Sequence, residues 1–522
     1  MTSDASRERR APRGAVAALL ASRWAPVGAG VLTGALVWWL WGSLRQVAVV
    51  HDEVANLLQA ELFASGRWTA PGRPLPEFFD QFHVLVTPLL APKYFPGHSL
   101  LMVPGVWLAL PGLVPVLLNA VTGGLLFALA RRVAGAGVAL GAWAFWVTAA
   151  GNLYYRASYL SPVTTGALWL LGWWALLAWR ETGRARWLVL LAGATGWCAI
   201  TRPLTGLVFA LPMAVVVPWL AIRRKAWRDL AVATAFGTAL VAILPLWNAR
   251  TTGDWRVTPY LLYSQTYFPF NVPGFGNHAP APAHTGSPDL QLYAADFGRV
   301  HREHTIAAVP RTLWHRLRYI TDNLFHGWRL LALPLALLGL WRLAAEVRFG
   351  LATAGIQVGA HLTMAHPSDW TAYYIEFYPV LAVLVGLGLA RIGPALWPRR
   401  WAVLTLSLVV TLLVTRDLTR RRVGERQERA WAVRFAAMLR GISDPRAVVF
   451  VRFAPVFNYH HGYIMNTPDL ERSRVWVVRD RGTENDRLLA LAPDRKAYLF
   501  DQAKDTLVLM PRPAPRTRPA AP

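Results

Sequence analysis

The chain has 522 residues, of which 54% are hydrophobic and only 16% are charged, and its formal net charge is +25. This balance excludes a soluble globular domain, which carries more charge, and a disordered chain, which carries fewer apolar residues. The single cysteine, Cys198, excludes an internal disulfide and a cysteine-based metal cage. We therefore predict a polytopic α-helical membrane protein.

Apolar runs long enough to cross a bilayer as helices recur along the chain. About eleven spans are predicted, at 25–44, 113–130, 135–152, 162–179, 187–201, 203–222, 229–249, 327–341, 349–365, 373–390 and 401–415. The run at 97–111 is shorter, carries Pro104 and ends in Pro-Gly. We predict that this run is re-entrant or interfacial and does not span.

The basic residues predict the orientation of the spans. Lys and Arg cluster in 1–24 and in every second connection, whereas the short turns on the other side hold only Arg156 and Arg202. By the positive-inside rule, the N-terminus of a protein in the cytoplasmic membrane then faces the cytoplasm and the C-terminus lies outside. This rule explains the positive charge better than a binding patch for nucleic acid, so no nucleic-acid partner is expected.

The orientation divides the chain into four parts. We expect a basic cytoplasmic tail at 1–24, a transmembrane module at 25–415, a small exoplasmic α/β domain at 416–510 and a disordered tail at 511–522. The α/β domain is predicted from four strand-like segments, AVVFVRF, SRVWVVRD, KAYLF and TLVLM. The outer loops 45–96 and 250–326 would share the outer face with this domain.

Two adjacent acids, Asp52 and Glu53, directly follow the exit from the first span. An amphipathic helix of about 14 residues, closed by Gly66, is predicted from Asp52 onward and is expected to lie on the membrane surface. Asp52 would then be the N-cap of this helix. A cap needs only one acceptor, however, and three titratable groups, including His51, sit together here. A cap and a catalytic role are both open at this point.

Three cations are candidates for binding an anion on the outer side. Lys93, in PLLAPKYFPGHSLLM, either binds the phosphate of a lipid carrier or extends to lipid phosphates of the bilayer. Arg156 and Arg202 stand alone in short outer turns near the hydrocarbon boundary, where arginines usually meet an anion. A lipid headgroup of the outer leaflet is the alternative partner, so membrane lipids are expected as further partners.

Aromatic and histidine residues of the outer loops are candidates for the rim of the same cavity. His366, in AHPSDWTAYYIEFYP, lies at another outer exit. The loop 250–326 is rich in Tyr, Phe, Pro, Gly and His, a composition that suits either an acceptor-binding lid or an anchor at the interface. Its histidines lack the spacing of a metal site, so no metal ligands are assigned.

The order of these elements resembles the GT-C membrane glycosyltransferases, in particular the bacterial relatives of protein O-mannosyltransferases and aminoarabinose transferases. The resemblance covers roughly 25–415. It rests on HDEVANLLQAELFASGRW, KYFPGHSLLM, the Arg-Arg turn after the second span, RASYLSP, TRPLTGL and LPLWNARTTGDWRVTPYLLYSQTYFP. The resemblance implies that a hexose or pentose is transferred from a polyprenyl-phosphate carrier to a glycan, lipid or protein acceptor on the outer face.

The resemblance also implies roles for particular residues. It maps the catalytic carboxylate to Asp52, with Glu53 beside it, and the lipid-phosphate region to Lys93 and Arg202. The remaining candidates for substrate binding are Tyr94, His98, Arg156 and His366. Where several relatives carry a second acid, this chain reads Tyr159-Leu160-Ser161. A two-carboxylate metal site is therefore not carried over, no cofactor is implied with certainty, and a divalent metal stays open.

These residue types suit an inverting sugar transfer. Asp52 would act as the base, with its pKa raised toward neutrality by partial burial unless a nearby cation opposes this. Lys93 and Arg202 would stabilise the leaving phosphate. The alternatives are a transporter or flippase for lipid-linked saccharides and a non-catalytic assembly protein of the cell envelope. The lack of an internal repeat and of charges inside the spans disfavours the transporter.

Overall fold

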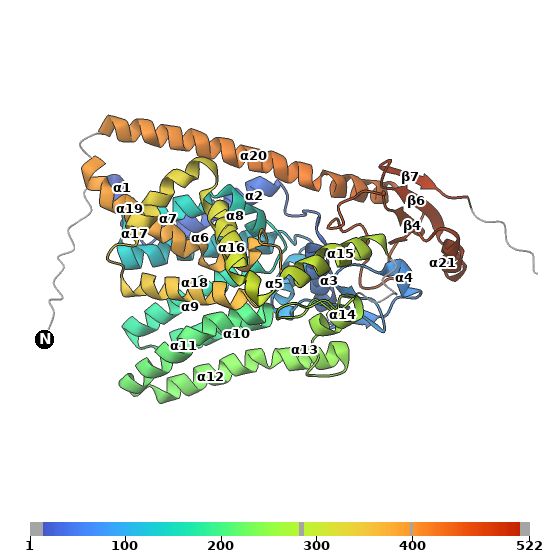
Figure 1. Cartoon of the computed structure of the whole chain (residues 1–522), viewed down its shortest axis with the longest axis horizontal. Coiled ribbons are helices and arrows are strands. Elements are labelled where there is room, and N and C mark those ends of the chain that lie inside the picture. Colours follow the sequence, from blue (N-terminus) through green and yellow to red (C-terminus); the bar gives the residue numbers. More distant parts are fainter. Residues whose placement is uncertain (1–13, 281–286, 397–399, 512–522) are drawn as a thin grey trace, which may run out of the picture.

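The computed structural model describes residues 14–280, 287–396 and 400–511. Helices lie side by side in a bundle at one end of the molecule, and a β-sheet lies at the other end (Figure 1). Apart from Pro511, the predicted disordered tail 511–522 lies outside the described residues, as does most of the predicted tail 1–24. Residues Ala15–Ala21 form a helix, α1, that the sequence analysis did not predict.

The bundle consists of helices rich in Leu, Val, Ala and Trp. They are α1, α2 (Ala25–Trp41), α6 (Leu113–Ala134), α7 (Ala136–Val147), α8 (Ala150–Arg156), α9 (Pro162–Thr182), α10 (Ala185–Thr201), α11 (Pro203–Arg224), α12 (Trp227–Val241), α13 (Ile243–Thr252), η2 (Gly327–Ala332), α17 (Leu333–Gly339), α18 (Ala345–His361), α19 (Tyr378–Leu396) and the first part of α20 (Arg400–Gly441). Among the described residues, five helices are long and apolar enough to span a membrane, or up to seven if each of two bent pairs counts once. The count of eleven spans therefore stays a prediction.

The predicted span 135–152 is wrong as one continuous helix. It breaks between α7 and α8, which are bent by 73°. Two arginine side chains bond to groups at this break: Arg156 donates to the Val147 carbonyl at 2.9 Å, and Arg329 donates to the Thr148 hydroxyl at 3.1 Å. The apolar run continues across the break, so composition alone did not show it.

The segment predicted not to span forms the helix α5 (Pro96–Trp107) of 12 residues. A helix of this length is about 18 Å long, which is too short to cross the roughly 30 Å of hydrocarbon. Its start packs against the end of α10, where a Cβ on Gly97 would lie only 2.3 Å from Thr201 Oγ1. The length of α5 agrees with the prediction.

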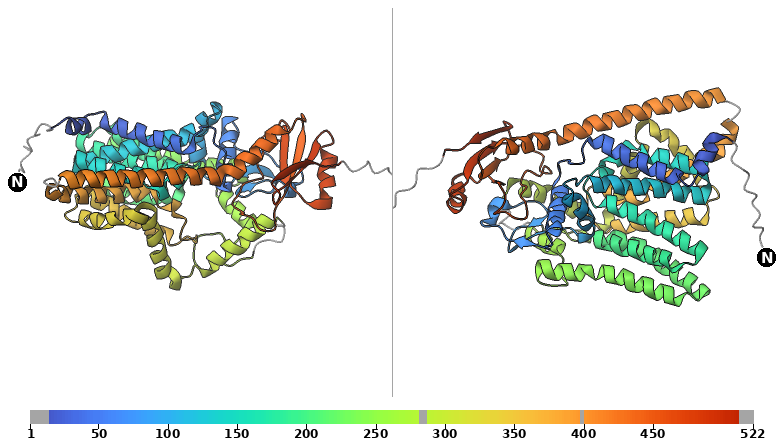
Figure 2. Two further views of the ribbon diagram at one scale, coloured as in Figure 1. Left: turned by 90° about the horizontal axis from the view of Figure 1, so that it is seen from above. Right: turned by 180° about the vertical axis from the view of Figure 1, so that it is seen from behind.

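The last helix, α20, is much longer than the predicted span 401–415. It has 42 residues, and a helix of that length extends for about 63 Å. It runs from the bundle to the C-terminal sheet (Figures 1 and 2). The predicted boundary between 415 and 416 therefore falls inside one continuous helix.

The remaining elements belong to the connections between the bundle helices. They are α3 (His51–Ala64), β1 (Ala70–Pro71), α4 (Pro76–Phe79), β2 (Val84–Leu85), β3 (Leu89–Pro92), α14 (Pro259–Tyr267), α15 (Pro288–Glu303), η1 (Ile306–Ala308), α16 (Val309–Phe325), η3 (Thr371–Tyr373) and η4 (Ile375–Phe377). The strands form a small antiparallel sheet in the order β1-β3-β2. The segment 250–326 is thus largely helical.

The C-terminal sheet consists of β4 (Ala447–Arg452), β5 (Val475–Arg479), β6 (Lys496–Asp501) and β7 (Thr506–Leu509), with η6 (Gly482–Glu484) and α21 (Asn485–Leu491) before β6. All four predicted strands form. Their order is β5-β4-β6-β7, with β4 parallel to both neighbours and β7 antiparallel to β6. One face of β4 packs on α20 and the other on α4, which explains why its sequence is apolar throughout.

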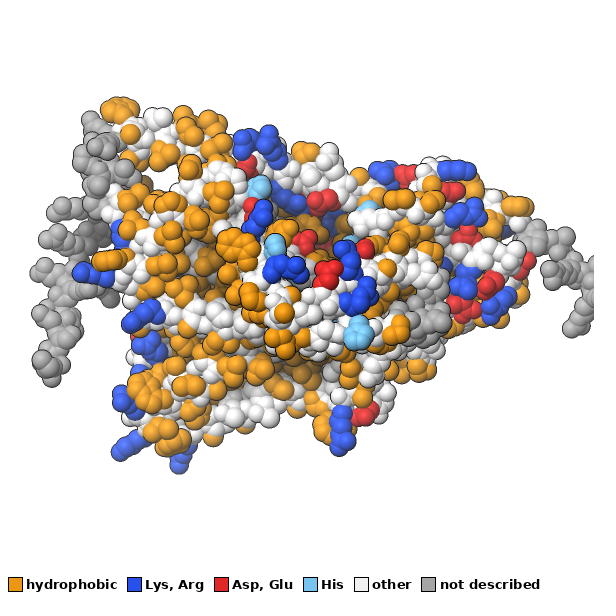
Figure 3. All heavy atoms as spheres, viewed as in Figure 1, with side chains coloured by type: hydrophobic (Ala, Val, Ile, Leu, Met, Phe, Trp, Pro, Cys, Tyr) orange, Lys and Arg blue, Asp and Glu red, His pale blue; other side chains and the backbone are white. Residues whose placement is uncertain are grey.

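Charge is distributed unevenly over the molecule. Hydrophobic side chains cover much of the helix bundle, whereas acidic and basic side chains alternate over α15, α16 and the C-terminal sheet (Figure 3). This pattern fits a bundle that faces lipid and an end that faces water.

Candidate active site

Asp52 lies in the first turn of α3, and two side chains hold its carboxylate. Oδ1 accepts a hydrogen bond from the Tyr94 hydroxyl at 2.5 Å, and Oδ2 lies 3.5 Å from His83 Nε2. The Asp52 side chain is 43% exposed, whereas the His83 side chain is 8% exposed. The carboxylate is therefore fixed in position but still accessible to a substrate.

The expectation that Asp52 caps α3 is wrong. The N-cap is Val50, α3 begins at His51, and no side chain caps this end. Glu53 binds the backbone that precedes the helix: its Oε2 accepts a hydrogen bond from the Val49 amide at 2.8 Å. The Asp52 carboxylate is thus not used by its own helix. The expected place of α3 on the membrane surface also differs, since most of its residues are buried in the protein.

The pKa of Asp52 is shifted in the direction opposite to the one expected. Burial raises the pKa of this carboxyl, but the charge and hydrogen bond of His83, together with Tyr94 and Lys93, lower it well below the ordinary value. Burial and Lys93 lower the pKa of His83 to about 4, against the effect of Asp52. At neutral pH, Asp52 is therefore ionised and His83 is neutral.

Lys93 is a buried cation without a carboxylate partner. It is 3% exposed, and no described carboxylate oxygen lies within 4.0 Å of its ammonium. Its Nζ lies 4.7 Å from the ring centre of Tyr260, 5.1 Å from that of Tyr263 and 5.4 Å from that of Tyr94. Burial lowers the pKa of Lys93 to about 8, although Asp52 acts to raise it. Tyrosine faces stabilise the charge without neutralising it, so the ammonium remains available to an anion.

The rings around Asp52 and Lys93 form what we call the aromatic cage: His83, Tyr94, Tyr260, Tyr263 and Tyr293. The ring of His83 lies 5.4 Å from that of Tyr94, 6.0 Å from that of Tyr263 and 6.4 Å from that of Tyr293. His83 has a φ of 68°, a left-handed conformation that costs energy for any residue except glycine. The fold thus holds this imidazole against Asp52 at an energetic cost, which is typical of functional sites.

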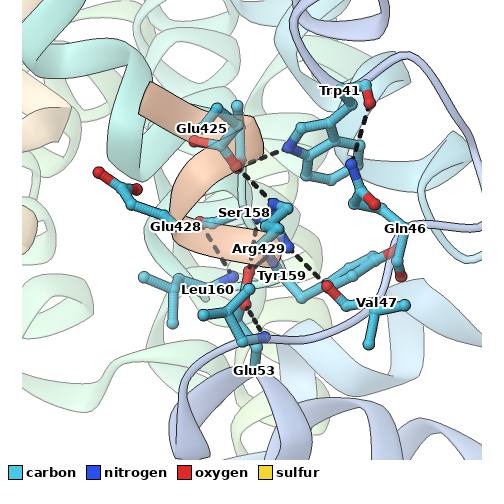
Figure 4. A network of polar contacts seen from close by, with 12 residues as sticks. Trp41, Gln46, Val47, Glu53, Ser158, Tyr159, Leu160, Glu425, Glu428 and Arg429 are labelled. Atoms are coloured by element: carbon cyan, nitrogen blue, oxygen red, sulfur yellow. Dashed lines mark hydrogen bonds and ion pairs between the residues drawn. The ribbon is translucent and has the colours of Figure 1, made fainter. Parts of the chain in front are cut away.

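Glu53 belongs to a different network, drawn in Figure 4. Its Oε1 accepts a hydrogen bond from the Tyr159 amide at 3.0 Å and lies 3.7 Å from Arg429 Nη2 of α20. Arg429 also bonds to Glu425 at 2.6 Å and to the Val47 carbonyl at 2.6 Å. Glu53 is 2% exposed. Its carboxylate therefore joins α3, the turn after α8 and α20, and it is not available to a substrate.

The other residues predicted from the KYFPGH segment fall into two groups. Tyr94 contacts Asp52 directly. His98 is fully buried, with Nδ1 2.8 Å from Thr164 Oγ1 and Nε2 2.9 Å from the Tyr159 carbonyl. Both ring nitrogens of His98 are bonded within the protein. His98 therefore joins α5 to α9 and to the connection between α8 and α9.

Arg202 is paired with an acid that the sequence analysis did not single out. Its Nη1 lies 3.1 Å from Glu376 Oε1 and donates to the Ala372 carbonyl at 2.9 Å. Glu376 is completely buried and also accepts from Thr165 and Gln357. The guanidinium lies 5.0 Å from the ring centre of Tyr373. Glu376 thus compensates part of the charge of Arg202, through one nitrogen of the guanidinium.

Arg156 and His366 do not lie in the aromatic cage. Arg156 is 2% exposed, stacks 3.9 Å from the ring centre of Trp146 and bonds to the backbone at the α7–α8 break. His366 is 5% exposed and contacts the Pro367 carbonyl at 2.8 Å and the Tyr374 hydroxyl at 3.3 Å. Both side chains are engaged by protein groups elsewhere.

Residues 459–462 of the C-terminal domain dock on the start of α3. His51 Nε2 contacts the Tyr459 carbonyl at 2.7 Å, and Val50 forms a β-bridge with His461. A Cβ on Gly462 would lie 2.9 Å from Val54, so only glycine fits there without a shift. The C-terminal domain therefore helps to hold the helix that carries Asp52.

The site offers little to a metal ion among the residues that the structure describes. No group of three or more His, Cys, Asp or Glu side chains in that part of the chain is arranged to hold one. Asp52 and His83 are the two ligand-type groups nearest to each other in the cage.

Comparison with known proteins supports the fold. No family model and no curated protein matches the sequence. Among solved structures, ArnT from Cupriavidus metallidurans bound to undecaprenyl phosphate matches with a TM-score of 0.51 at 14% sequence identity, over 92% of this chain and 93% of that chain. The apo state of the same ArnT gives a TM-score of 0.49 at 15% identity, over 91% and 92% of the two chains. The chain therefore shares the overall fold of this ArnT over nearly its whole length.

Proposed function

We propose that this protein transfers a hexose or pentose from a polyprenyl-phosphate carrier to an acceptor on the outer face of the cytoplasmic membrane. The observation that carries the proposal is the arrangement of Asp52 and Lys93. Each shifts the pKa of the other, yet the two charged groups are not in contact within 4.0 Å. A fixed carboxylate and a nearby ammonium that pairs with no carboxylate of the described residues suit an attacking hydroxyl and a leaving phosphate.

The transfer proceeds by displacement at the anomeric carbon. An acceptor hydroxyl or amine forms the new bond to this carbon while the bond from carbon to the phosphate oxygen breaks. The polyprenyl phosphate leaves with the electron pair of that bond, and the proton of the acceptor passes to Asp52. Because the nucleophile attacks opposite to the leaving group, the configuration at this carbon is inverted.

Tyr94 and His83 orient the Asp52 carboxylate in this proposal. They also keep it ionised at neutral pH, so that it is ready to accept a proton. A carboxylate with a lowered pKa is a weak base, and it therefore takes up the proton late, when the new bond to carbon is largely formed. Lys93 stabilises the negative charge that the phosphate gains.

Arg202 serves in the proposal as the second cation near the phosphate. Glu376 holds its guanidinium over the ring of Tyr373. The bound undecaprenyl phosphate of ArnT, whose fold this chain shares, supports a polyprenyl phosphate as the carrier.

The proposal is tested with purified full-length protein in proteoliposomes. Radiolabelled hexoses and pentoses on undecaprenyl phosphate are supplied together with an envelope extract as the source of acceptor, and label in the acceptor fraction is measured. Asp52→Asn should lower transfer by about 10²–10⁴-fold, the usual effect of losing a general base, while undecaprenyl phosphate still binds.

Asp254→Asn, in an exposed turn after α13, is the matched control and should leave transfer unchanged. Transfer by Asp52→Asn within tenfold of the unaltered protein would rule out Asp52 as the base. Label that crosses the bilayer without entering the acceptor fraction would favour a transporter.

A further inference from the structure

A cavity that shares no lining residue with the aromatic cage opens between α15 and the C-terminal sheet. We call it the sheet pocket; its volume is about 690 Å³, and it is lined by the first turn of α15 and by residues that follow β4 and β5. These two strands are parallel neighbours, so both present their carboxyl ends here. Ligands of α/β domains usually bind at the carboxyl ends of parallel strands, and this volume is typical of small-molecule sites.

Arg452 presents a charged group of the sheet pocket to a ligand. Its Nε donates to Asp480 Oδ2 at 2.7 Å, but neither Nη bonds to any residue in the described part of the chain. The Arg452 side chain is 52% exposed, whereas that of Asp480 is 7% exposed. Asp480 also accepts from Asn485 at 2.7 Å and from the Gly482 amide at 3.1 Å. Asp480 therefore fixes one edge of a guanidinium whose other edge is free.

The other charges of the sheet pocket are paired, and Glu484 is bound by Arg481 at 3.2 Å. Arg479 is 3% exposed and makes two hydrogen bonds to Asp289 of α15, at 2.5 and 2.8 Å. Its Nε donates to the Asp80 carbonyl at 2.7 Å, so all its nitrogens are used. This buried pair fastens β5 to α15 and keeps the two walls of the pocket together.

Aromatic and polar groups complete the lining. The rings of Phe453 and Phe457 lie 5.0 Å apart, and both line the sheet pocket together with Gln291. A guanidinium with a free edge favours the paired oxygens of a carboxylate or phosphate. Aromatic faces favour the apolar face of a sugar ring. An anionic sugar satisfies both groups at once.

We infer that the sheet pocket binds an anionic sugar, carrying a carboxylate or a phosphate, that belongs to the acceptor. The assignment to the acceptor rests on the proposed transferase function; the binding of an anionic sugar does not. One chain segment connects the two sites: Phe453 and Phe457 line the sheet pocket, and Tyr459, two residues after Phe457, contacts His51 beside Asp52. An acceptor held in the sheet pocket is therefore held by the segment that docks on α3.

The test measures binding of three probes to the full-length protein in detergent micelles by isothermal titration calorimetry. The probes are glucose 1-phosphate, glucuronate and glucose. Arg452→Gln should weaken the binding of glucose 1-phosphate or glucuronate at least about tenfold and leave that of glucose unchanged, because only the anionic probes use the free guanidinium edge. The stronger of the two anionic probes identifies the group as phosphate or carboxylate.

Arg472→Gln, whose side chain is 88% exposed on the C-terminal domain, is the matched control and should bind like the unaltered protein. Phe457→Ala should weaken all three probes. Failure of the unaltered protein to bind either anionic probe, or equal binding by Arg452→Gln, would overturn the inference. Asp52→Asn should bind the probes normally, so a failure of the proposed catalytic role and a failure of the sheet pocket give different results.

Discussion

Lys93 should make the binding of polyprenyl phosphate depend on pH in a range where ordinary lysines do not titrate. Burial lowers the pKa of this ammonium to about 8, against the effect of Asp52, whereas an exposed lysine titrates near 10.4. Only the protonated ammonium attracts the phosphate. The affinity for polyprenyl phosphate should therefore be highest below pH 8. It should weaken as the pH rises through about 8, the pKa of Lys93 in the protein without ligand.

The size of the effect follows from the pKa. A group with a pKa of about 8 is about nine-tenths protonated at pH 7 and about one-tenth protonated at pH 9, so the affinity should fall about tenfold, which equals ~1.4 kcal/mol. A phosphate monoester loses its second proton near pH 6, and its charge is therefore almost constant over this range. Asp52 stays ionised between pH 7 and 9, so it does not change the affinity over this range.

The assay is native mass spectrometry of the full-length protein in nanodiscs with undecaprenyl phosphate, between pH 6.5 and 9.5. Lys93→Arg should hold its affinity up to pH 9.5, because a guanidinium remains charged. Lys93→Met should bind weakly at every pH. A flat profile for the unaltered protein, or an equal decline in Lys93→Arg, would refute the role of the Lys93 charge.

Three further substitutions separate structural from functional groups. Arg479→Leu leaves the Asp289 carboxylate buried without its partner and should destabilise the docking of the C-terminal sheet by about 3–5 kcal/mol, seen as faster limited proteolysis; an unchanged rate would contradict the buried pair. Glu53→Gln should keep sugar transfer within tenfold of the unaltered protein but lower the thermal midpoint, because it removes a charge beside Arg429; a loss as large as that of Asp52→Asn would make Glu53 catalytic. His98→Gln should retain its affinity for undecaprenyl phosphate within about twofold, since both ring nitrogens are bonded inside the protein, and a tenfold loss would indicate direct contact.

Local patterns in the sequence determined the class of the fold and several of its parts. The four C-terminal strands, the short α5 and the 14-residue α3 all follow from residue periodicity and from apolar runs with turn signals at their ends. These features depend on neighbours within a few residues, and such neighbours are visible in one dimension. Asp52 and Lys93 were singled out as charged residues on the outer side, but their roles and the choice of Tyr94 came from the resemblance to a known family. The tertiary structure brings Asp52, Lys93 and Tyr94 together.

Only the tertiary structure decided what each polar group does. His83 carries no local signal, and Tyr263 and Tyr293 were noticed only as part of the aromatic-rich loop 250–326. The fold brings these rings together around Asp52 and Lys93. Long-range contacts also removed Glu53 from the list of available groups, since the Tyr159 amide and Arg429 reach it from elsewhere in the chain.

The direction of the pKa shift of Asp52 has the same origin. Burial alone would raise the pKa, and the sequence showed only the burial expected at a bilayer exit. The charge and hydrogen bond of His83 and the hydrogen bond of Tyr94 outweigh it, and both depend on side-chain distances of a few ångströms. Electrostatic energies change steeply over such distances, so this sign is set by the fold and not by the order of residues along the chain.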